Sequence, residues 1–246
     1  MEIREPERLT PVVAEADVVV VGSGPGGLSA AIAAARAGVS VILIERFGCF
    51  GGNITSVGVE GFAWYRHKKT IEAGGLAFEY EQRAIENNAA VPESQSKSYE
   101  LDSEAFKVVA DNLVLEAGVR PMLHRAFCSP ILEGNEIKGV ITESKAGREA
   151  IMGKIIIDAT GDADVARRSG VTVFKNSKED MISASVMFHM SGVNKEEFMD
   201  EIKRDPQKYS DWSDKNWQVQ TSGKEDDMFS PFLRKPFEKA KDAGLI

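Results

Sequence analysis

A glycine-rich segment near the start of the chain restricts the fold more than any other feature. The run VVVVGSGPGGLSAAIAAARAGVSVILIE begins at Val18 and ends at Glu45. It predicts a strand over residues 17–21, an alanine-rich helix that ends at Gly38, and a second strand over residues 39–45. Strand, glycine turn, helix and strand in this order form the beginning of a βαβ unit.

The glycines of this turn follow the pattern G-x-G-x-x-G, which points to a phosphate-binding loop. Gly22 permits a tight turn, Gly24 lets the backbone approach a pyrophosphate, and Gly27 lets the helix pack closely on the strands. The N-terminus of the helix, with Pro25 and Gly26, supplies N–H groups and the positive end of the helix dipole. Glu45 ends the next strand, about twenty residues on, where a carboxylate accepts hydrogen bonds from a ribose hydroxyl. These residues predict a dinucleotide site.

The glycine pattern alone does not separate NAD from FAD, but the rest of the chain does. An NAD-only domain of this kind continues with alternating helices and strands. This chain instead predicts a glycine- and aromatic-rich loop over residues 47–69 and helices over residues 71–87 and near 102–117. Strands over residues 122–132, 137–144 and 149–158 follow, joined by the turns Gly134-Asn135 and Ala146-Gly147, and these form a β-meander. We therefore expect FAD as the cofactor.

Two segments carry a resemblance to a known family. ERFGCFGGNIT follows the second strand, and IDATGDADVA ends the meander. With the glycine turn, they resemble the FAD-dependent oxidoreductases of the glutathione-reductase type, related to the fumarate reductase and succinate dehydrogenase flavoproteins. The resemblance covers residues 17–193. It implies an α/β fold, in which a Rossmann-like FAD-binding domain with a parallel sheet plus a β-meander is followed by part of a second, α+β substrate domain.

The resemblance also implies further cofactor contacts. Glu45 holds the adenosine ribose and Arg46 flanks the adenine, while Gly51, Gly52 and Thr55 lie along the pyrophosphate and toward the flavin. The backbone of Ala126 and Phe127 borders the adenine. Thr160, Gly161 and Asp162 form the family's second turn beside the first glycine loop.

Residues that could move a substrate proton are few. His67 lies in a basic cluster, WYRHKK, which could face an anionic substrate, although a solvated basic loop explains it at least as well. His189 lies on a candidate strand over residues 182–193, where a structural histidine is the simpler interpretation. His124 is interpreted as structural. Cys49 lies close to the place where some relatives attach flavin through a histidine, but free cysteines are usually inert small hydrophobes.

Composition excludes several classes of function. The net charge is −8, from 30 basic and 38 acidic residues, which argues against nonspecific binding to nucleic acid or to an anionic membrane. Two cysteines make neither a disulfide framework nor a metal-ligand set. No apolar run is long enough to span a bilayer, and the charged first fifteen residues lack the core of a signal peptide. We expect a cytoplasmic protein.

The expected organisation is a leader over residues 1–15, an FAD-binding domain over residues 16–170 and a partial substrate or cap domain over residues 171–246. In the resembled family the chain returns from the substrate domain to complete the FAD domain. Here the sequence stops at KAKDAGLI, so we expect another polypeptide to complete the site. The expected activity is hydride transfer between a small organic substrate and flavin N5. The alternatives are an FAD-binding subunit without turnover and an FAD-dependent lyase or hydratase with no net redox change.

Overall fold

A computed structural model describes residues 3–4, 6–62, 66–67, 70–71, 73–92, 98–181, 190–194, 196–198, 200 and 234–245. For residues 66–67, 70–71 and 234–237 it describes the backbone alone. The chain divides into two compact units. The first comprises Met1–Phe62, Gly74–Val91 and Tyr99–Met187, and the second comprises Ala63–Ala73, Pro92–Ser98 and Phe188–Ile246.

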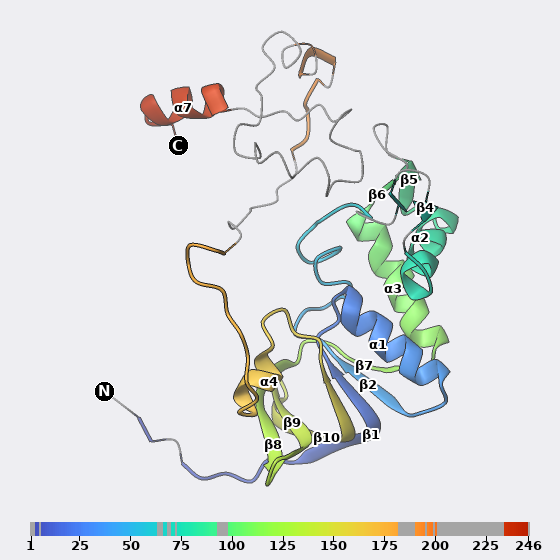
Figure 1. Ribbon diagram of the computed structural model, residues 1–246, viewed down its shortest axis with the longest axis vertical. Helices are drawn as coiled ribbons and strands as arrows, with labels where there is room; N and C mark the ends of the chain where they lie inside the picture. Colours follow the sequence, from blue (N-terminus) through green and yellow to red (C-terminus); the bar gives the residue numbers. More distant parts are fainter. Residues whose placement is uncertain are drawn as a thin grey trace. The chain divides into compact units, whose positions relative to one another are not determined.

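A mixed six-stranded sheet forms the centre of the first unit, in the order β7-β2-β1-β10-β9-β8 (Figure 1). Four neighbouring strands run parallel: β7 (Arg120–Met122), β2 (Val41–Ile44), β1 (Val12–Val21) and β10 (Gly147–Asp158). The other two, β9 (Glu136–Ser144) and β8 (Ala126–Glu133), continue the sheet as an antiparallel meander. The fold is therefore the predicted α/β arrangement of a parallel sheet plus a β-meander.

A layer of helices lies beside the parallel strands. The first helix, α1 (Pro25–Arg36), contacts β1, β2 and β10, and it also contacts α2 (Leu76–Glu86) and α3 (Ser103–Glu116). Helix α3 begins where predicted, because the Asp102 side chain accepts hydrogen bonds from the backbone N–H groups of Glu104 and Ala105, each at 2.9 Å. A small two-stranded sheet of β5 (Ala90–Pro92) and β6 (Tyr99–Leu101) precedes it.

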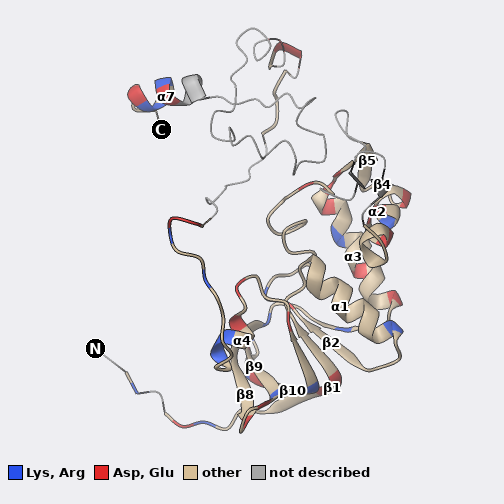
Figure 2. Ribbon diagram, viewed as in Figure 1, with Lys and Arg blue, Asp and Glu red and all other residues tan. Residues whose placement is uncertain are grey.

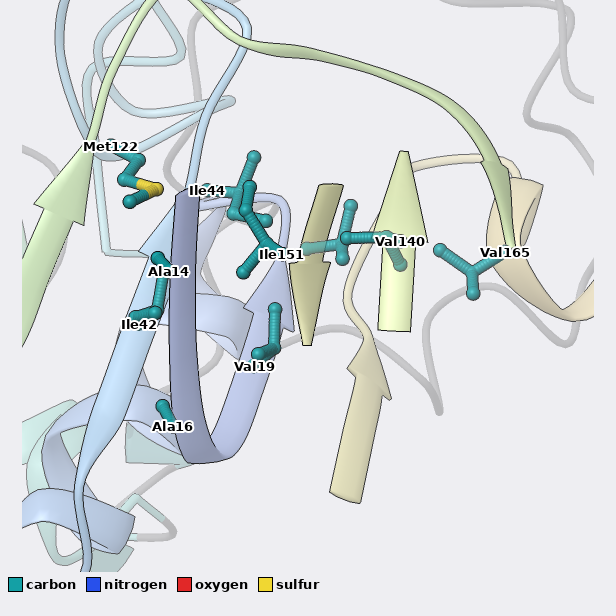
Figure 3. Packing of buried hydrophobic residues seen from close by; sticks show 10 residues of the cluster. Ala14, Ala16, Val19, Ile42, Ile44, Met122, Val140, Ile151 and Val165 are labelled. Carbon is teal, nitrogen blue, oxygen red and sulfur yellow. The ribbon is translucent and has the colours of Figure 1, made fainter. Parts of the chain in front are cut away.

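The alternation of side chains along β1 and β2 produces two apolar layers. Val19 and Val21 join Ile42 and Ile44 in a buried cluster that also contains Ile151 of β10 and Val165 of α4 (Asp164–Arg168) (Figure 3). The intervening residues of both strands are also buried, and they point to the opposite face, where α1 packs. With both faces covered, the strands read as continuous apolar runs in the sequence.

The meander differs from the prediction at its first strand. The predicted strand over residues 122–132 is two strands, β7 and β8, which lie at opposite edges of the sheet. Between them the chain crosses the sheet, and His124 takes a left-handed backbone conformation with φ of 56°. Apolar residues on both sides of the crossing made the segment resemble a single strand.

Other boundaries also shift. Strand β1 begins at Val12, five residues before the predicted start, so the end of the expected leader pairs with β10. The helix predicted over residues 71–87 begins only at Leu76. Of the predicted strand over residues 182–193, residues 182–189 lie outside the described residues. Residues 196–198 and 200 are helical.

The described part of the second unit contains a short antiparallel hairpin and a helix. Strands β3 (Arg66–His67) and β4 (Thr70–Ile71) pair with each other, and the helix is α7 (Arg234–Asp242). Among the described residues, no helix combines the length and the apolar character needed to cross a bilayer.

Candidate dinucleotide site

The parallel strands end level with one another, and this edge of the sheet contains a cavity. Val21 pairs with both Ile44 and Asp158, and Ile44 pairs with Met122. The loops that follow these strands therefore leave the sheet side by side. They enclose about 540 Å³, a volume in the range of small-molecule and cofactor sites. Ligands of open α/β sheets bind at this carboxyl edge.

Most of the predicted cofactor residues line this cavity. They come from the first glycine turn, the end of β2, the second glycine pair, the start of β8 and the turn after β10: Gly22, Gly24, Pro25, Gly26, Glu45, Arg46, Gly52, Ala126, Phe127, Thr160, Gly161 and Asp162. Gly27, Gly51 and Thr55 do not line it. Sequence positions more than a hundred residues apart thus meet around one space.

The first glycine turn has both tightly packed and open positions. A Cβ on Gly22 would lie 2.5 Å from the carbonyl oxygen of Ala159, and one on Gly27 would lie 1.9 Å from the carbonyl oxygen of Gly22. These two glycines therefore serve the packing of turn, helix and strand. In contrast, a Cβ on Gly24 or Gly26 would meet no atom within 4 Å, and both positions line the cavity. The open space over them fits a ligand that approaches the backbone closely.

Helix α1 directs its N-terminus at the same space. Its N-cap is Gly24, which has no side chain that could cap the helix, and Pro25 occupies the first turn. The first N–H groups of a helix have no partner inside the helix, and the helix dipole adds partial positive charge there. No acidic side chain occupies this first turn. The arrangement suits a phosphate or pyrophosphate group.

Glu45 is buried at the end of β2 and held by three donors. Its Oε2 accepts hydrogen bonds from the backbone N–H of Ser23 at 2.9 Å and from the Ser23 hydroxyl at 2.6 Å. Its Oε1 accepts one from the backbone N–H of Phe47 at 2.9 Å. The carboxylate thereby joins the first glycine turn to the loop after β2, and it lines the cavity at 6% exposure.

The second glycine pair packs against the first glycine turn. The N–H of Gly51 donates to the carbonyl oxygen of Ser23 at 2.9 Å, and a Cβ on Gly52 would lie 2.7 Å from the Cα of Gly24. Thr55 is buried, and its hydroxyl donates to the carbonyl oxygen of Phe50 at 2.6 Å. Gly51 and Thr55 thus shape the loop behind the cavity wall, while Gly52 reaches the cavity itself.

The second turn is organised by Asp158 at the end of β10. Its Oδ1 accepts hydrogen bonds from the N–H and the hydroxyl of Thr160, at 3.0 and 2.6 Å, and its Oδ2 accepts one from the N–H of Ala166 at 2.8 Å. The Thr160 hydroxyl in turn accepts from the N–H of Asp164 at 2.8 Å. A Cβ on Gly161 would meet nothing within 4 Å. This turn therefore offers a third open backbone position to a ligand.

Arginines line the part of the cavity near β8. The Arg168 guanidinium lies 5.7 Å from the centroid of the Phe127 ring, and it donates to the carbonyl oxygen of Cys128. Arg125 forms an ion pair with Glu149, and Arg46 lies 4.6 Å from the centroid of the Phe47 ring. The basic end of α4 stands out in blue in Figure 2. Each guanidinium is thus held by a protein partner beside the space where a ligand would lie.

Several residues of the site were not predicted from the sequence. Ser23 occupies the variable position inside the first glycine turn, so its hydroxyl is a signal that could have been used. Arg125 and Arg168 gave no such signal, because their partners Glu149 and Phe127 are far from them in the sequence and meet them only through the meander and α4.

The side chains of the two candidate catalytic residues lie outside the described part of the chain. The backbone of His67 lies in β3, but its side chain is outside the described part, and His189 is outside it altogether. His124 is exposed, its N–H donates to the carbonyl oxygen of Phe47 at 3.1 Å, and a Cβ on Gly48 would lie 2.7 Å from its ring.

Cys49 is a free thiol, and its sulfur lies 3.6 Å from the Ser56 hydroxyl. Within the described residues, no cluster of three or more His, Cys, Asp or Glu side chains could hold a metal ion.

The family model described as "FAD dependent oxidoreductase" matches residues 17–243, which is most of the chain. The chain belongs to the FAD-dependent oxidoreductase family. The predicted family is confirmed at this level, while the closer relation to fumarate reductase and succinate dehydrogenase flavoproteins stays a prediction.

Curated relatives include thiamine thiazole synthases of archaea. The protein from Saccharolobus islandicus is 33% identical over 162 residues, covering 61% of this chain and 57% of the relative. The protein from Sulfolobus acidocaldarius is 31% identical over the same coverage. The chain thus spans a little more than half the length of these relatives.

Among solved structures, a geranylgeranyl bacteriochlorophyll reductase-like protein from Thermoplasma acidophilum has a similar fold. It superposes with a TM-score of 0.50 at 20% identity, covering 64% of this chain and 42% of that chain. At this identity the likeness concerns the fold alone.

Proposed function

We propose that this chain binds FAD in the cavity at the carboxyl edge of its sheet, as the cofactor-binding part of an oxidoreductase. The observation that carries the proposal is the open space over Gly24, Gly26 and Gly161, three backbone positions that converge on one cavity beside a helix N-terminus. Close backbone approach and unpaired helix N–H groups are what a pyrophosphate requires. The family supports FAD as the dinucleotide.

In this proposal the chain's own residues bind and orient the cofactor. The N-terminus of α1 holds the pyrophosphate, and Glu45 accepts a hydrogen bond from the adenosine ribose. The backbone of Ala126 and Phe127 would border the adenine, and the turn at Thr160–Asp162 would meet the cofactor beside the first glycine loop. Bound FAD supplies the hydride-transfer chemistry, and the protein supplies position, electrostatics and exclusion of water.

The proposed reaction is oxidation or reduction of a small organic substrate. His67 and His189 stay the candidates for moving the substrate proton, because a flavin-dependent dehydrogenation needs a group that takes or gives a proton. That a second polypeptide completes the cofactor and substrate sites also stays a prediction.

A second candidate is an FAD-dependent synthase or lyase reaction with no net redox change. The specific support is that the relatives at 31–33% identity are named thiamine thiazole synthases rather than dehydrogenases. An FAD-binding subunit without turnover of its own is the remaining alternative. These candidates share the cavity and differ in what happens to the flavin.

Cofactor binding is tested first, with the 246-residue chain. We expect the purified protein to be yellow, to release FAD on denaturation, and to bind FAD more tightly than FMN or NAD⁺ in calorimetric titrations. Gly24→Val places a branched side chain in open cavity space, so FAD affinity is expected to fall by about tenfold or more, as for loss of roughly 1.4 kcal/mol. Gly74→Val is the matched control, since a Cβ there also meets nothing within 4 Å but the residue does not line the cavity. A protein that prefers NAD⁺, or FAD binding unchanged in Gly24→Val, contradicts the proposal.

The reaction type is tested separately by anaerobic mixing with candidate substrates. Loss of the oxidised flavin band on mixing favours the oxidoreductase. Product that forms while the band is unchanged favours the synthase or lyase. A flavin that binds with no product and no spectral change in any mixture favours a binding subunit.

A further inference from the structure

Ser23 and Phe47 leave the Glu45 carboxylate with a single open acceptor position. A carboxylate has about four lone-pair sites for hydrogen bonds. In Glu45 the N–H and hydroxyl of Ser23 take two sites on Oε2, and the N–H of Phe47 takes one on Oε1. One site on Oε1 is left. Among the described residues, these three donors are the only hydrogen-bond partners of this carboxylate.

Burial fixes this arrangement in place. Ser23 is 0% exposed and Glu45 is 6% exposed. Because water has little access to them, losing one of these donors would leave the carboxylate with an unsatisfied acceptor, which is costly. The backbone on both sides is also tied: the N–H of Gly22 donates to the carbonyl oxygen of Ile44, and the N–H of Arg125 donates to that of Glu45, each at 2.9 Å. The carboxylate therefore has one orientation rather than several.

We propose that Ser23 is a positioning residue that restricts Glu45 to one ribose hydroxyl of the bound nucleotide. A carboxylate with two open sites accepts both the 2′- and the 3′-hydroxyl of a ribose, whereas this one accepts a single hydroxyl. The site accordingly requires one of the two hydroxyls and tolerates loss of the other. The inference rests on the proposed function, because it takes the adenosine ribose as the group that Glu45 meets.

The wild-type chain gives the first test, with ADP, 2′-deoxy-ADP and 3′-deoxy-ADP as probes in calorimetric titrations. One deoxy analogue is expected to bind about ten- to a hundredfold more weakly than ADP, the effect of losing a hydrogen bond to a charged group. The other is expected to bind within about threefold of ADP. Equal losses for both analogues, or no loss for either, overturn the inference.

The second test uses Ser23→Ala, which removes the hydroxyl and keeps the backbone N–H. The carboxylate then gains a second open site and loses one restraint, so the ratio between the two deoxy analogues is expected to fall toward one. A merely structural defect weakens all three nucleotides by a common factor and leaves this ratio unchanged, and that result contradicts the inference.

Ser40→Ala is the matched control. The N–H and hydroxyl of Ser40 bind one carboxylate oxygen of Asp17 at 3.0 and 2.6 Å, the same pattern as Ser23 and Glu45, but this pair does not line the cavity. In this variant the ratio of the affinities for 2′-deoxy-ADP and 3′-deoxy-ADP is expected to equal that of the wild type. If the wild-type chain binds neither FAD nor ADP, the proposed function itself fails. FAD binding with equal loss for both analogues overturns only the role of Ser23.

Discussion

The same pair of strands is tied together by a serine and a carboxylate at both of its ends. Just before the first paired residues of β1 and β2, Val18 and Val41, Ser40 donates from its N–H and hydroxyl to Oδ2 of Asp17. At the carboxyl ends, Ser23 donates from the same two groups to Oε2 of Glu45. The distances agree within 0.1 Å, from 3.0 and 2.6 Å in the first pair to 2.9 and 2.6 Å in the second.

The two pairs differ in their surroundings rather than in their chemistry. Asp17 of β1 also forms an ion pair with Lys154 of β10, at 2.6 Å. That pair is exposed to solvent, whereas Ser23 and Glu45 are buried and line the cavity. In a parallel sheet the chain enters helices from the carboxyl ends of the strands, so loops and a helix N-terminus converge only there. Position in the sheet, more than residue type, makes one pair part of a binding site and the other a surface tie.

The largest difference between the two ends is expected from two glycines with nearly the same backbone conformation. Gly22 follows β1 at the carboxyl end with φ of 96°, and Gly38 precedes β2 at the amino end with φ of 91°. Alanine costs about 1–2 kcal/mol at either position because of the left-handed backbone. At Gly22 the added Cβ also lies 2.5 Å from the carbonyl oxygen of Ala159, whereas at Gly38 it meets nothing within 4 Å. Overpacking of this kind adds about 1–3 kcal/mol.

Urea denaturation of the two variants measures this difference. Gly22→Ala is expected to lose clearly more unfolding free energy than Gly38→Ala, and to lose FAD affinity as well, since the turn must move. Equal losses of unfolding free energy in the two variants would show that the backbone at Ala159 moves away from the added Cβ at no measurable cost.

The next effect in size is expected from the carboxylates themselves. Glu45→Ala leaves the N–H and hydroxyl of Ser23 and the N–H of Phe47 without their acceptor, at a cost of about 1–3 kcal/mol in unfolding free energy. It also removes a charged acceptor from the proposed ribose site, which lowers FAD binding by about 1.5–3 kcal/mol. Asp17→Ala serves as the control, and its FAD affinity is expected to equal that of the wild type. Matching FAD affinities in all three proteins would remove Glu45 from the cofactor site.

The sequence alone predicts those parts of the molecule in which local pattern and spacing decide the structure. The apolar run before Gly22, the glycine spacing and the position of Glu45 predicted the βαβ unit, and twelve predicted cofactor residues line one cavity. The assignment of those residues as FAD contacts stays a prediction. Long-range pairing was less accessible. The split of residues 122–132 into β7 and β8 depends on a chain crossing at His124, whose left-handed conformation is unusual for a residue other than glycine.

The orientation of Glu45 was also beyond the sequence. The serine in G-S-G occupies a position that most residues can fill, so the pattern does not indicate that its side chain holds the carboxylate. Arg168 reaches Phe127 and Cys128 only because α4 packs on β8. Contacts of this kind require the meander to be in place, and no local signal encodes them.

The smallest effect is expected from acid and salt acting on the exposed pair. The Lys154 ammonium, and after it the Ser40 hydroxyl and N–H, hold the pKa of Asp17 well below its usual range. Because the pKa is lower in the folded state, the stabilisation is complete above the unfolded pKa of about 3.9 and is lost as the pH falls further toward the folded value. The difference in melting temperature between the wild type and Asp17→Asn is therefore expected to be largest near neutral pH and to shrink below about pH 4. Since the pair is solvent-exposed, about 1 M salt should shrink the same difference at neutral pH, where the Debye length falls to about 3 Å. A difference in melting temperature that grows on acidification, or that does not respond to salt, would mean that the pair of Asp17 and Ser40 is shielded from solvent like the pair of Glu45 and Ser23. Burial would then no longer explain why only one of the two pairs belongs to the cavity.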